Sequence, residues 1–342
     1  MLIPNLVSIL TPIYQHERYI GACIESVLCQ SYENWEQLIL DDGSQDETGM
    51  IARAFAEKDC RIQYFYQAHR GRNHIGDNYN WLFERSQGEF IAILEGDDYW
   101  AVDKLNRLIP LLQDNPEIVL AYGYTQVVDD RDFIPTRKTQ TIPGEDIVKM
   151  GEAVINNQPV TSITRVLLSG MVLMPVSVVI RRSALEAIGG FRTVEDGHAV
   201  DYATTLELSR IGSFLFVPSI LGFWRRHENQ QSSSNVLEKA MLADYRYAIS
   251  YMERYASELQ MSHAQRIMIE NSWRRARAGA YLRSGRNSLI QHEWRAARGK
   301  FIQVFRHHPN RFQSGYALAG LILSLLHLDL RSFNQFIGGQ HL

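Results

Sequence analysis

The sequence predicts an α/β protein with a mainly parallel sheet flanked by helices, followed by a C-terminal helical extension. Two observations support this fold class. Apolar segments of strand length alternate with amphipathic segments of helix length through the first half of the chain, at intervals that fit strand–helix–strand units. The run FIAIL at residues 90–94 is apolar throughout, which is typical of a parallel strand buried on both faces.

Each element is predicted from its own pattern of apolar residues. An apolar run that is too short for a helix predicts a strand, and such runs occupy residues 6–10, 35–40, 61–66, 89–94, 118–124 and 214–217. Apolar residues on one helical face predict a helix, and this pattern covers residues 16–30, 46–57, 75–85, 103–113, 181–188 and 202–211. The strands and helices therefore follow one another in the order that a parallel sheet requires.

The length and a change of pattern predict the domain organisation. A chain of 342 residues can bury a large core in one large domain or two modest ones. A serine-rich break at residues 232–234 separates the alternating region from a segment in which the apolar residues follow helical spacing. We therefore expect a sheet-containing domain at residues 1–232 and a helical region at residues 233–342.

Charge is distributed unevenly along the chain. The net charge is −3, but residues 262–342 carry twelve Lys and Arg against three Asp and Glu, which gives +9 there and −12 in the rest. A basic tail on an acidic body indicates a partner for the tail, and anionic lipid, a phosphorylated substrate or the protein's own acidic surface would each fit. Peripheral membrane contact through this basic C-terminal region is one prediction, and we expect no nucleic-acid partner.

The cysteines and the N-terminus favour a cytoplasmic protein. Cys23, Cys29 and Cys60 lack the spacing of metal ligands, and we interpret them as reduced thiols. The N-terminus lacks the basic start and the cleavage site of a signal peptide. The longest apolar run, at residues 317–328, is too short to span a bilayer comfortably. We expect a cytoplasmic location, with the inner face of the cell membrane as the site of any lipid contact.

An acidic cluster directly follows the strand predicted at residues 89–94. Glu95, Asp97 and Asp98 place three carboxylates within four residues, where like charges repel and burial is costly. A divalent cation removes this cost, because hard carboxylate oxygens suit Mg²⁺ or Mn²⁺. Gly96 permits a tight turn and the close approach of a ligand. The alternative interpretation is a solvated acidic turn after a strand.

Two other predicted strands end in residues that could contribute to the same site. In parallel sheets ligands bind at the carboxyl ends of the strands, and here Thr11-Pro12 and Asp41-Asp42 follow the first and second strands. The sequence contains no G-x-G-x-x-G after a strand and no Walker A motif. It therefore argues against a nicotinamide dehydrogenase and against a P-loop enzyme.

The ordered set of motifs resembles the family 2 glycosyltransferases, which have the GT-A fold. VSILTPIYQHERYIGACIESVLCQSYENWEQLILDDGSQDET is similar to the opening of that family, and GEFIAILEGDDYW is similar to its metal-binding strand end. IGGFRTVEDGHAVDYATTLELSRIG, followed by GFWRRHENQQS, resembles its acceptor-side region. The resemblance covers roughly residues 6–232 and implies a nucleotide-sugar donor and inverting transfer to a hydroxyl of a glycan or lipid-linked acceptor.

The resemblance also implies roles for residues on the donor side. Thr11, Pro12 and Tyr14 would line the nucleotide pocket, and Asp42, or Asp41 beside it, would accept the ring N–H of uracil or thymine. Asp97 and Asp98 would hold Mg²⁺ or Mn²⁺ against the diphosphate. Glu95 stands where the family usually has Asp, so it is the weakest of the three metal assignments. Arg72, with Arg70 and Asn78, falls where relatives place donor-binding residues, or else forms a solvated basic turn.

On the acceptor side the resemblance implies one general base and one further ligand. Asp201, in VDY, matches the catalytic base of the family, and its structural alternative is an N-cap of the helix that follows. Glu195 and Asp196 are nearby alternatives for the base. His227, in WRRHEN, resembles a histidine that closes over the metal or the diphosphate in many relatives. Arg225 or Arg226 would contact phosphate, unless both are solvated.

The leading interpretation is an inverting, metal-dependent glycosyltransferase that acts in the synthesis of surface polysaccharide. Two other functions compete with it. A sugar-phosphate nucleotidyltransferase shares the strand-loop layout, but it would have a glycine-rich basic loop after the first strand, and no glycine precedes Gly21 here. An inactive carbohydrate-binding or scaffold module would not need the three aspartates Asp97, Asp98 and Asp201. Fold resemblance alone does not establish activity.

Overall fold

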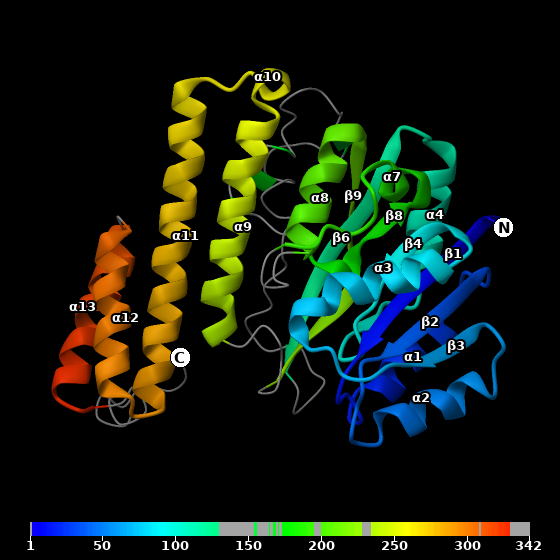
Figure 1. The fold of residues 1–342 in the computed structure, drawn as a ribbon, viewed down its shortest axis with the longest axis horizontal. Helices are drawn as coiled ribbons and strands as arrows, with labels where there is room; N and C mark the ends of the chain where they lie inside the picture. Colours follow the sequence, from blue (N-terminus) through cyan, green and yellow to red (C-terminus); the bar gives the residue numbers. More distant parts are fainter. Residues whose placement is uncertain are drawn as a thin grey trace. The chain divides into compact units, whose positions relative to one another are not determined.

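The chain folds into two compact units. The computed structural model describes residues 2–129, 154–155, 164, 167–168, 170, 173–194, 200–227, 234–307 and 309–328. The first unit, here called the sheet unit, comprises Met1–Leu167 and Met171–Glu228, and the second, the helical unit, comprises Leu168–Gly170 and Asn229–Leu342 (Figure 1). The division predicted between residues 232 and 233 falls on residues outside the described part of the chain.

The sheet unit is built on a nine-stranded sheet. The strands are β1 (Ile3–Ile13), β2 (Trp35–Asp41), β3 (Ile62–Tyr66), β4 (Gly88–Ile93), β5 (Tyr99–Trp100), β6 (Ile118–Asp129), β7 (Val154–Ile155), β8 (Val179–Arg181) and β9 (Ser213–Arg226). Their order is β3-β2-β1-β4-β8-β6-β9-β5, and β7 pairs with β9. The six strands predicted from apolar runs are all present.

The sheet has a parallel half and a mixed half. Strands β3, β2, β1 and β4 run parallel, as predicted. Strand β8 is antiparallel to both of its neighbours, β4 and β6. Beyond it β6 and β9 are again parallel, and the short β5 and β7 pair antiparallel with β9. Strand β9 continues well past the predicted residues 214–217 because register shifts opposite Gly123 and Tyr124 accommodate the Pro218 region.

Helices cover the parallel half on both faces. The helices of this unit are α1 (Ile20–Leu28), α2 (Thr48–Ala56), α3 (Ile75–Arg85), α4 (Lys104–Asp114), α7 (Arg182–Ala187) and α8 (Val200–Ile211), with the 3-10 turns η1 (Arg72–His74) and η2 (Pro175–Ser177). Apolar residues of α1, α2 and α4 form one buried cluster with Val7, Ile9 and Phe90 of the sheet. Helix α3 packs against β1 and β2 and lies on the other face (Figure 1).

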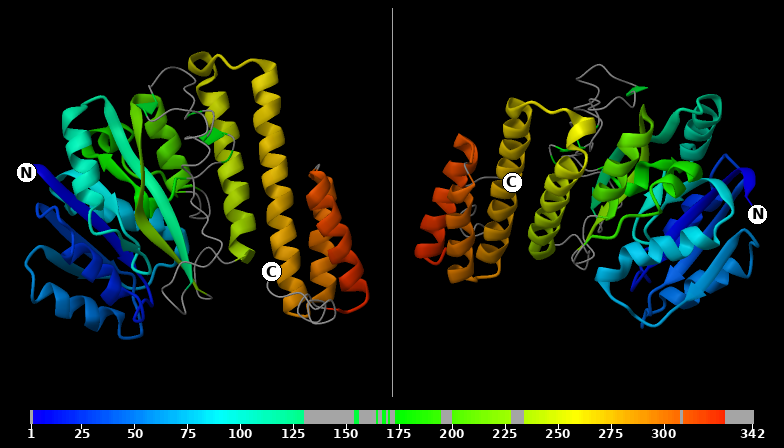
Figure 2. Two further views of the ribbon diagram at one scale, coloured as in Figure 1. Left: turned by 180° about the vertical axis from the view of Figure 1, so that it is seen from behind. Right: turned by 45° about the horizontal axis from the view of Figure 1, so that its top comes forward.

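The helical unit consists of α9 (Ser234–Arg254), α10 (Ala256–Leu259), α11 (His263–Ile290), α12 (Trp294–Arg306) and α13 (Arg311–Leu325). Helices α11, α12 and α13 pack side by side (Figure 2). Capping boxes begin α11 at Ser262 and α13 at Asn310, each with Gln three residues later. Phe301 fills the core between Gly285 and Gly320, where an added Cβ would lie 2.8 Å and 2.3 Å from its ring. None of the described helices is both long enough and apolar enough to span a membrane.

Helix α9 carries a buried carboxyl group. The Asp244 side chain is only 8% exposed, and its Oδ1 has no hydrogen-bond partner among the residues that the structure describes. Burial raises the pKa of Asp244 to about 8. Between the ordinary carboxyl pKa of about 4 and this value, the folded protein keeps a proton that the unfolded chain releases. The free energy of unfolding therefore falls as the pH rises through this window.

We expect Asp244→Asn to weaken this pH dependence and to stabilise the protein at the upper end of the window. The amide keeps the size of the side chain and carries no charge, and each unit of pKa shift corresponds to about 1.4 kcal/mol. Thermal unfolding followed by circular dichroism at about pH 5 and about pH 8 measures the effect. Glu270→Gln, on the exposed surface of α11, is the charge-matched control. Equal pH dependence of the parent and Asp244→Asn would contradict the prediction.

Candidate active site

The predicted site residues gather at one edge of the parallel half of the sheet. Strands β1, β2 and β4 are parallel neighbours, so their carboxyl ends lie together. The register pairs Ile13 with Asp41 and Leu10 with Ile93. Beyond these pairs the Asp42 N–H donates to the Ile13 carbonyl at 2.9 Å. The strand order therefore brings the acidic cluster and the ends of β1 and β2 to the same edge, as predicted. The first strand is longer than predicted, however, because Thr11 and Pro12 pair with Ile39 and Leu40 inside β1 and do not follow it.

The acidic cluster is compact and largely buried. Ligand atoms of Glu95, Asp97 and Asp98 lie within 4.8 Å of one another. Asp97 is 7% exposed and Asp98 is 4% exposed, so the alternative of a solvated acidic turn is wrong for these two residues. Hard carboxylate oxygens that converge in a buried position fit Mg²⁺ or Mn²⁺.

The charges of the cluster are strongly coupled. Burial and the neighbouring Asp97 raise the pKa of Glu95 to about 7, although a hydrogen bond from the Tyr79 hydroxyl opposes the shift. Burial, Asp97 and Glu95 raise the pKa of Asp98 well above its usual value. Burial also acts to raise the pKa of Asp97, but nearby His16 and His227 outweigh it, and the pKa of Asp97 is lowered. A cation bound among the three carboxylates would relieve this repulsion.

Two other elements hold the carboxylates in place. The Tyr79 hydroxyl, from α3, donates to Glu95 Oε1 at 2.8 Å. The Arg225 backbone N–H, from β9, donates to Asp98 Oδ1 at 2.9 Å. The extension of β9 to Arg226 is what brings this backbone to the cluster, because β5, directly after Asp98, pairs with β9 through Tyr99 and Phe223.

His227 lies against the acidic cluster, as the resemblance implied. Its Nε2 is 3.0 Å from Asp97 Oδ2, and its ring lies 4.8 Å from the ring of Tyr19 between centroids. Neutral imidazole nitrogen is a common metal ligand, and a protonated ring nitrogen can donate to a phosphate. The position of His227 beside Asp97 fits its predicted part in the metal site.

Arg225 is buried rather than solvated. The residue has no exposed surface. Its guanidinium lies 4.9 Å from the centroid of the Tyr19 ring and 5.2 Å from that of Tyr99. Arg226, by contrast, is exposed and lies over Trp224. The alternative that both arginines are solvated is therefore wrong for Arg225, whose guanidinium lies against two aromatic rings.

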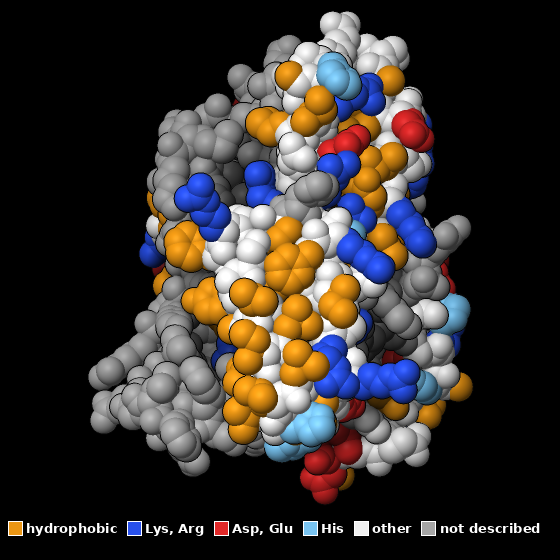
Figure 3. All heavy atoms as spheres, turned by 90° about the vertical axis from the view of Figure 1, so that its left-hand side faces the viewer, with side chains coloured by type: hydrophobic (Ala, Val, Ile, Leu, Met, Phe, Trp, Pro, Cys, Tyr) orange, Lys and Arg blue, Asp and Glu red, His pale blue; other side chains and the backbone are white. Residues whose placement is uncertain are grey.

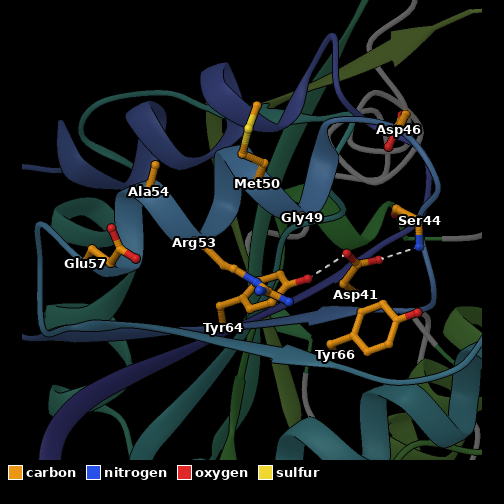
Figure 4. Close-up of a pocket in the computed structure, with 10 residues that line it drawn as sticks. All are labelled: Asp41, Ser44, Asp46, Gly49, Met50, Arg53, Ala54, Glu57, Tyr64 and Tyr66. Carbon is orange, nitrogen blue, oxygen red and sulfur yellow. Dashed lines mark hydrogen bonds between the residues drawn. The ribbon is translucent and has the colours of Figure 1, made fainter.

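Asp41 and Asp42 face different surroundings. The Asp41 carboxylate accepts hydrogen bonds from the Tyr64 hydroxyl and the Ser44 N–H, both at 2.8 Å, and lines a pocket of about 450 Å³ beside α2 (Figure 4). The Asp42 carboxylate instead accepts bonds from Gln67 Nε2 at 2.6 Å and from the Arg70 N–H at 3.1 Å. Asp42 therefore organises the loop that follows β3.

Tyr14 is partly exposed beside this loop, whereas Thr11 is buried. The Tyr14 ring stacks on the His69 ring with 4.1 Å between centroids and 19° between planes. His69 Nδ1 lies 3.0 Å from Asp42 Oδ2. The Thr11 hydroxyl accepts a hydrogen bond from Gln37 Nε2 at 3.0 Å inside the sheet, and Pro12 is buried next to it. Only Tyr14 of the three residues predicted after β1 presents a ring at the surface of the site.

The basic residues after β3 are partly described. Arg72 begins the turn η1, but its side chain lies outside the description. The Arg70 guanidinium pairs with Asp77 at 3.1 Å on the surface. Asn78 is buried, and its Oδ1 accepts a bond from Gln67 Nε2 at 2.8 Å. Asn78 thus supports the loop that Asp42 holds.

Asp201 lies in the first turn of α8, one residue after its start at Val200. This position is inside the helix, so the N-cap interpretation is wrong for Asp201. Burial raises the pKa of Tyr79 well above its usual value, and the negative charges of Glu95 and Asp201 add to the shift. The Asp201 carboxylate thus acts electrostatically on the side chain that binds Glu95. The alternative bases Glu195 and Asp196 lie outside the described residues.

The sequence patterns did not indicate three residues of the site. These are Tyr79, Tyr19 and His16. They lie in helical or turn segments whose sequence pattern indicates ordinary packing against the sheet. His16 interacts electrostatically with Asp97 and His227, and an added Cβ on Gly96 would lie 2.6 Å from His16 Nδ1. Gly96 does not have a positive φ, so it is needed for this close approach and not for a left-handed turn.

Comparison with known proteins gives a family for these features. The sequence model described as glycosyl transferase family 2 matches residues 8–189, more than half of the chain. EpsJ, an uncharacterised glycosyltransferase of Bacillus subtilis (strain 168), is 33% identical over 131 residues, which are 38% of this chain and 37% of EpsJ. GlyG, a glycosyltransferase of Streptococcus pneumoniae serotype 4, is 30% identical over 130 residues, which are 38% of this chain and 42% of GlyG. The chain thus spans less than half the length of these relatives.

Solved structures share the fold at low sequence identity. TarS 1–349 of S. aureus in complex with UDP has a TM-score of 0.54 and 15% identity, and the match covers 98% of this chain and 93% of that chain. The mannosyltransferase PcManGT of Pyrobaculum calidifontis, in complex with GDP-Man and Mn²⁺, has a TM-score of 0.55 and 16% identity, and the match covers 93% of this chain and 86% of that chain. These likenesses are consistent with a GT-A type fold. By the match over residues 8–189, the chain belongs to glycosyl transferase family 2.

Proposed function

We propose that this protein is an inverting glycosyltransferase that uses a UDP- or dTDP-sugar donor and a hydroxyl of a glycan or lipid-linked acceptor. The observation that carries the proposal is the convergence of Glu95, Asp97 and Asp98 at the carboxyl end of a parallel sheet, at the edge where β1 and β2 lead into Tyr14 and Asp42. The solved neighbours are complexes with UDP, UDP-GlcNAc and GDP-Man, which supports a nucleotide-sugar donor. TuaG of Bacillus subtilis, provisionally assigned to teichuronic acid biosynthesis, is 34% identical over 125 residues and supports a role in surface polysaccharide.

The residues present fit a divalent cation, and Mn²⁺ or Mg²⁺ is the proposed cofactor. Asp97 and Asp98 would hold it, with Glu95 and His227 as further ligands, and it would supply charge neutralisation for the diphosphate that leaves the sugar. The Arg225 backbone N–H and the Tyr79 hydroxyl orient Asp98 and Glu95 for this task. Asp201 accepts the proton of the attacking hydroxyl, because transfer needs a positioned base close to the acceptor.

We propose that the nucleobase stacks on the Tyr14 ring and that the ring N–H of the nucleobase donates to the Asp42 carboxylate. His69 already makes both of these contacts, since its ring stacks on Tyr14 and its Nδ1 lies beside the Asp42 carboxylate. His69 is exposed and its loop is short, so the side chain can leave this place when a nucleotide arrives. We infer that His69 competes with the base for Tyr14 and Asp42.

We therefore expect His69→Ala to bind UDP several-fold more tightly than the parent protein. A stacked aromatic pair contributes about 0.5–1.5 kcal/mol, and the substitution removes this competing interaction from the free protein. Isothermal titration calorimetry with UDP and Mn²⁺ measures the change. His74→Ala, at the next histidine along the chain, is the control because His74 pairs with Asp77 and not with Asp42. Weaker binding by His69→Ala would show that the ring holds the base and does not compete with it.

A donor screen tests the proposed function as a whole. The purified chain is mixed with Mn²⁺ and a panel of UDP-, dTDP- and GDP-sugars, and ligand-dependent thermal shift is recorded. A donor at about 100 times its dissociation constant stabilises the folded state by about 2.7 kcal/mol, which is measurable as a rise in Tm. A rise with nucleotide sugars that requires Mn²⁺ or Mg²⁺ is the expected result. Stabilisation by nucleoside triphosphate and sugar 1-phosphate alone would instead favour a nucleotidyltransferase.

A further inference from the structure

The outer face of the last two helices is apolar and exposed. On α13 and the turn after it, side chains between 41% and 79% exposed include two aromatic and five aliphatic residues. These are Phe312, Tyr316, Leu318, Ile322, Leu325, Leu326 and Leu328. Ile302 and Phe305 of α12 are 48% and 43% exposed. Figure 3 shows apolar side chains gathered in a band on the side of the molecule where α12 and α13 lie.

Packing inside the helical unit does not account for this face. Ala317, Gly320 and Leu323 of α13 are buried, and Ala317 and Leu323 belong to the cluster around Phe301. Because these residues already supply the inward face, the exposed apolar residues form a second face of the same helix. A helix that is apolar on both sides normally has a partner on each, and a large exposed apolar patch marks an interaction site.

The charged residues within α12 and α13 are all basic, while Glu293 precedes α12 and acidic side chains lie at one end of the apolar band in Figure 3. From Trp294 to Leu325 the sequence contains five Lys and Arg residues and no Asp or Glu. The five are Arg295, Arg298, Lys300, Arg306 and Arg311. Arg295, Arg306 and Arg311 are exposed, and Figure 3 shows Lys and Arg side chains at the edges of the apolar band. The surface therefore combines apolar area with positive charge, and it is complementary to an apolar partner that carries negative charge.

We propose that the α12–α13 face docks on an anionic lipid surface, with its apolar side chains in the interface and its basic side chains at the headgroups. Amphipathic helices with these two features bind membranes in this way, and none of the described helices can span one. A second copy of the chain fits less well. A two-fold dimer would set this patch against itself, so that its basic residues would face a second basic surface with no acidic partner from α12 or α13. The proposal goes beyond the transfer reaction and does not depend on it.

Vesicle flotation with the full chain tests the proposal. The protein is mixed with vesicles of phosphatidylcholine alone or of phosphatidylcholine with phosphatidylglycerol, at low and at high salt. We expect binding to the anionic vesicles at low salt, and weaker binding at high salt or without phosphatidylglycerol. Arg306→Gln with Arg311→Gln should reduce the affinity roughly 30-fold, which follows from about 1 kcal/mol for each charge.

The apolar part of the face is tested separately. Phe312 and Leu325 are 79% and 64% exposed, so Phe312→Ser with Leu325→Ser should keep the fold, which circular dichroism and the Tm check. This variant should lose most vesicle binding at equal lipid concentration. Met268→Ser, at an exposed apolar residue of α11, is the matched control and should bind as the parent does. No binding of the parent to anionic vesicles would overturn the proposal. Unchanged vesicle binding by the double serine variant would also overturn it. A parent protein that forms a dimer in sedimentation but does not bind vesicles, together with a double serine variant that is monomeric, would show that the face is a dimer interface.

Discussion

Asp98→Asn should abolish sugar transfer while leaving the protein folded. Asp98 is one of three carboxylates that converge within 4.8 Å, and the substitution removes a charge that the proposed cation needs. Loss of a residue that only orients a ligand costs about 10–100-fold in activity or metal affinity, so loss of a ligand should cost at least as much. The amide oxygen of Asn can still accept the hydrogen bond from the Arg225 N–H, which is why the fold should survive.

The measurement combines turnover with donor binding. UDP affinity is titrated with and without Mn²⁺, and we expect the parent to bind more tightly with the metal and Asp98→Asn to show no such difference. Asp103→Asn is the matched control, because Asp103 is a nearby aspartate that pairs with Arg107 on the surface. Near-normal turnover of Asp98→Asn, or a parent enzyme that is indifferent to a chelator, would remove Asp98 from the metal site.

The parallel half of the fold could be predicted because its signals are local. Residues 90–94 form an unbroken apolar run that ends abruptly in charge, and the strand β4 indeed ends at Ile93. The carboxyl ends of parallel strands lie at one edge whatever their order, so the position of Asp41-Asp42 at the same edge as the acidic cluster follows from the fold class. The family model that covers residues 8–189 confirms the resemblance that the motifs indicated.

The mixed half could not be predicted in the same way. Strand β8 is antiparallel to β4, and nothing in its residues VIR distinguishes a parallel from an antiparallel strand. The apolar run at residues 214–217 predicted a short strand, whereas β9 continues through Pro218 and Gly222 to Arg226 with irregularities in its register with β6. This extension decides the chemistry, because it carries the Arg225 backbone and His227 to the acidic cluster.

Pairwise contacts between distant elements are the part of a site that sequence patterns do not contain. The Tyr79 hydroxyl reaches Glu95 from α3, and the Arg225 guanidinium lies between two tyrosine rings, but no local pattern distinguishes either residue from an ordinary core or surface residue. The acidic residues of the site could be identified from the sequence, because several carboxylates at the end of a buried strand repel one another unless a cation binds them. Residues that support them by hydrogen bonds become recognisable only when the fold is known.

Asp201→Asn should lower turnover by about 10²–10⁴, the usual contribution of general-base catalysis. Inverting displacement requires the base and the leaving diphosphate on opposite sides of the anomeric carbon. By analogy with inverting glycosidases, we expect roughly 6–10 Å between the Asp201 carboxylate and the bound metal. The electrostatic effect of Asp201 on Tyr79, which binds Glu95, supports a position facing the acidic cluster. Because Asn has the same size as Asp, stability and donor binding should be spared.

Three measurements distinguish a base from a structural residue at position 201. Thermal unfolding and UDP titration of Asp201→Asn should match the parent, while transfer is slow at every donor concentration. Glu84→Gln, at an exposed glutamate of α3, controls for the loss of one negative charge. An Asp201→Asn protein that unfolds would assign the residue to the fold of α8, and one that transfers sugar normally would move the base to Glu195 or Asp196. The anomeric configuration of the product gives the last test, since a single in-line displacement must invert it and a retained configuration would overturn the proposed mechanism.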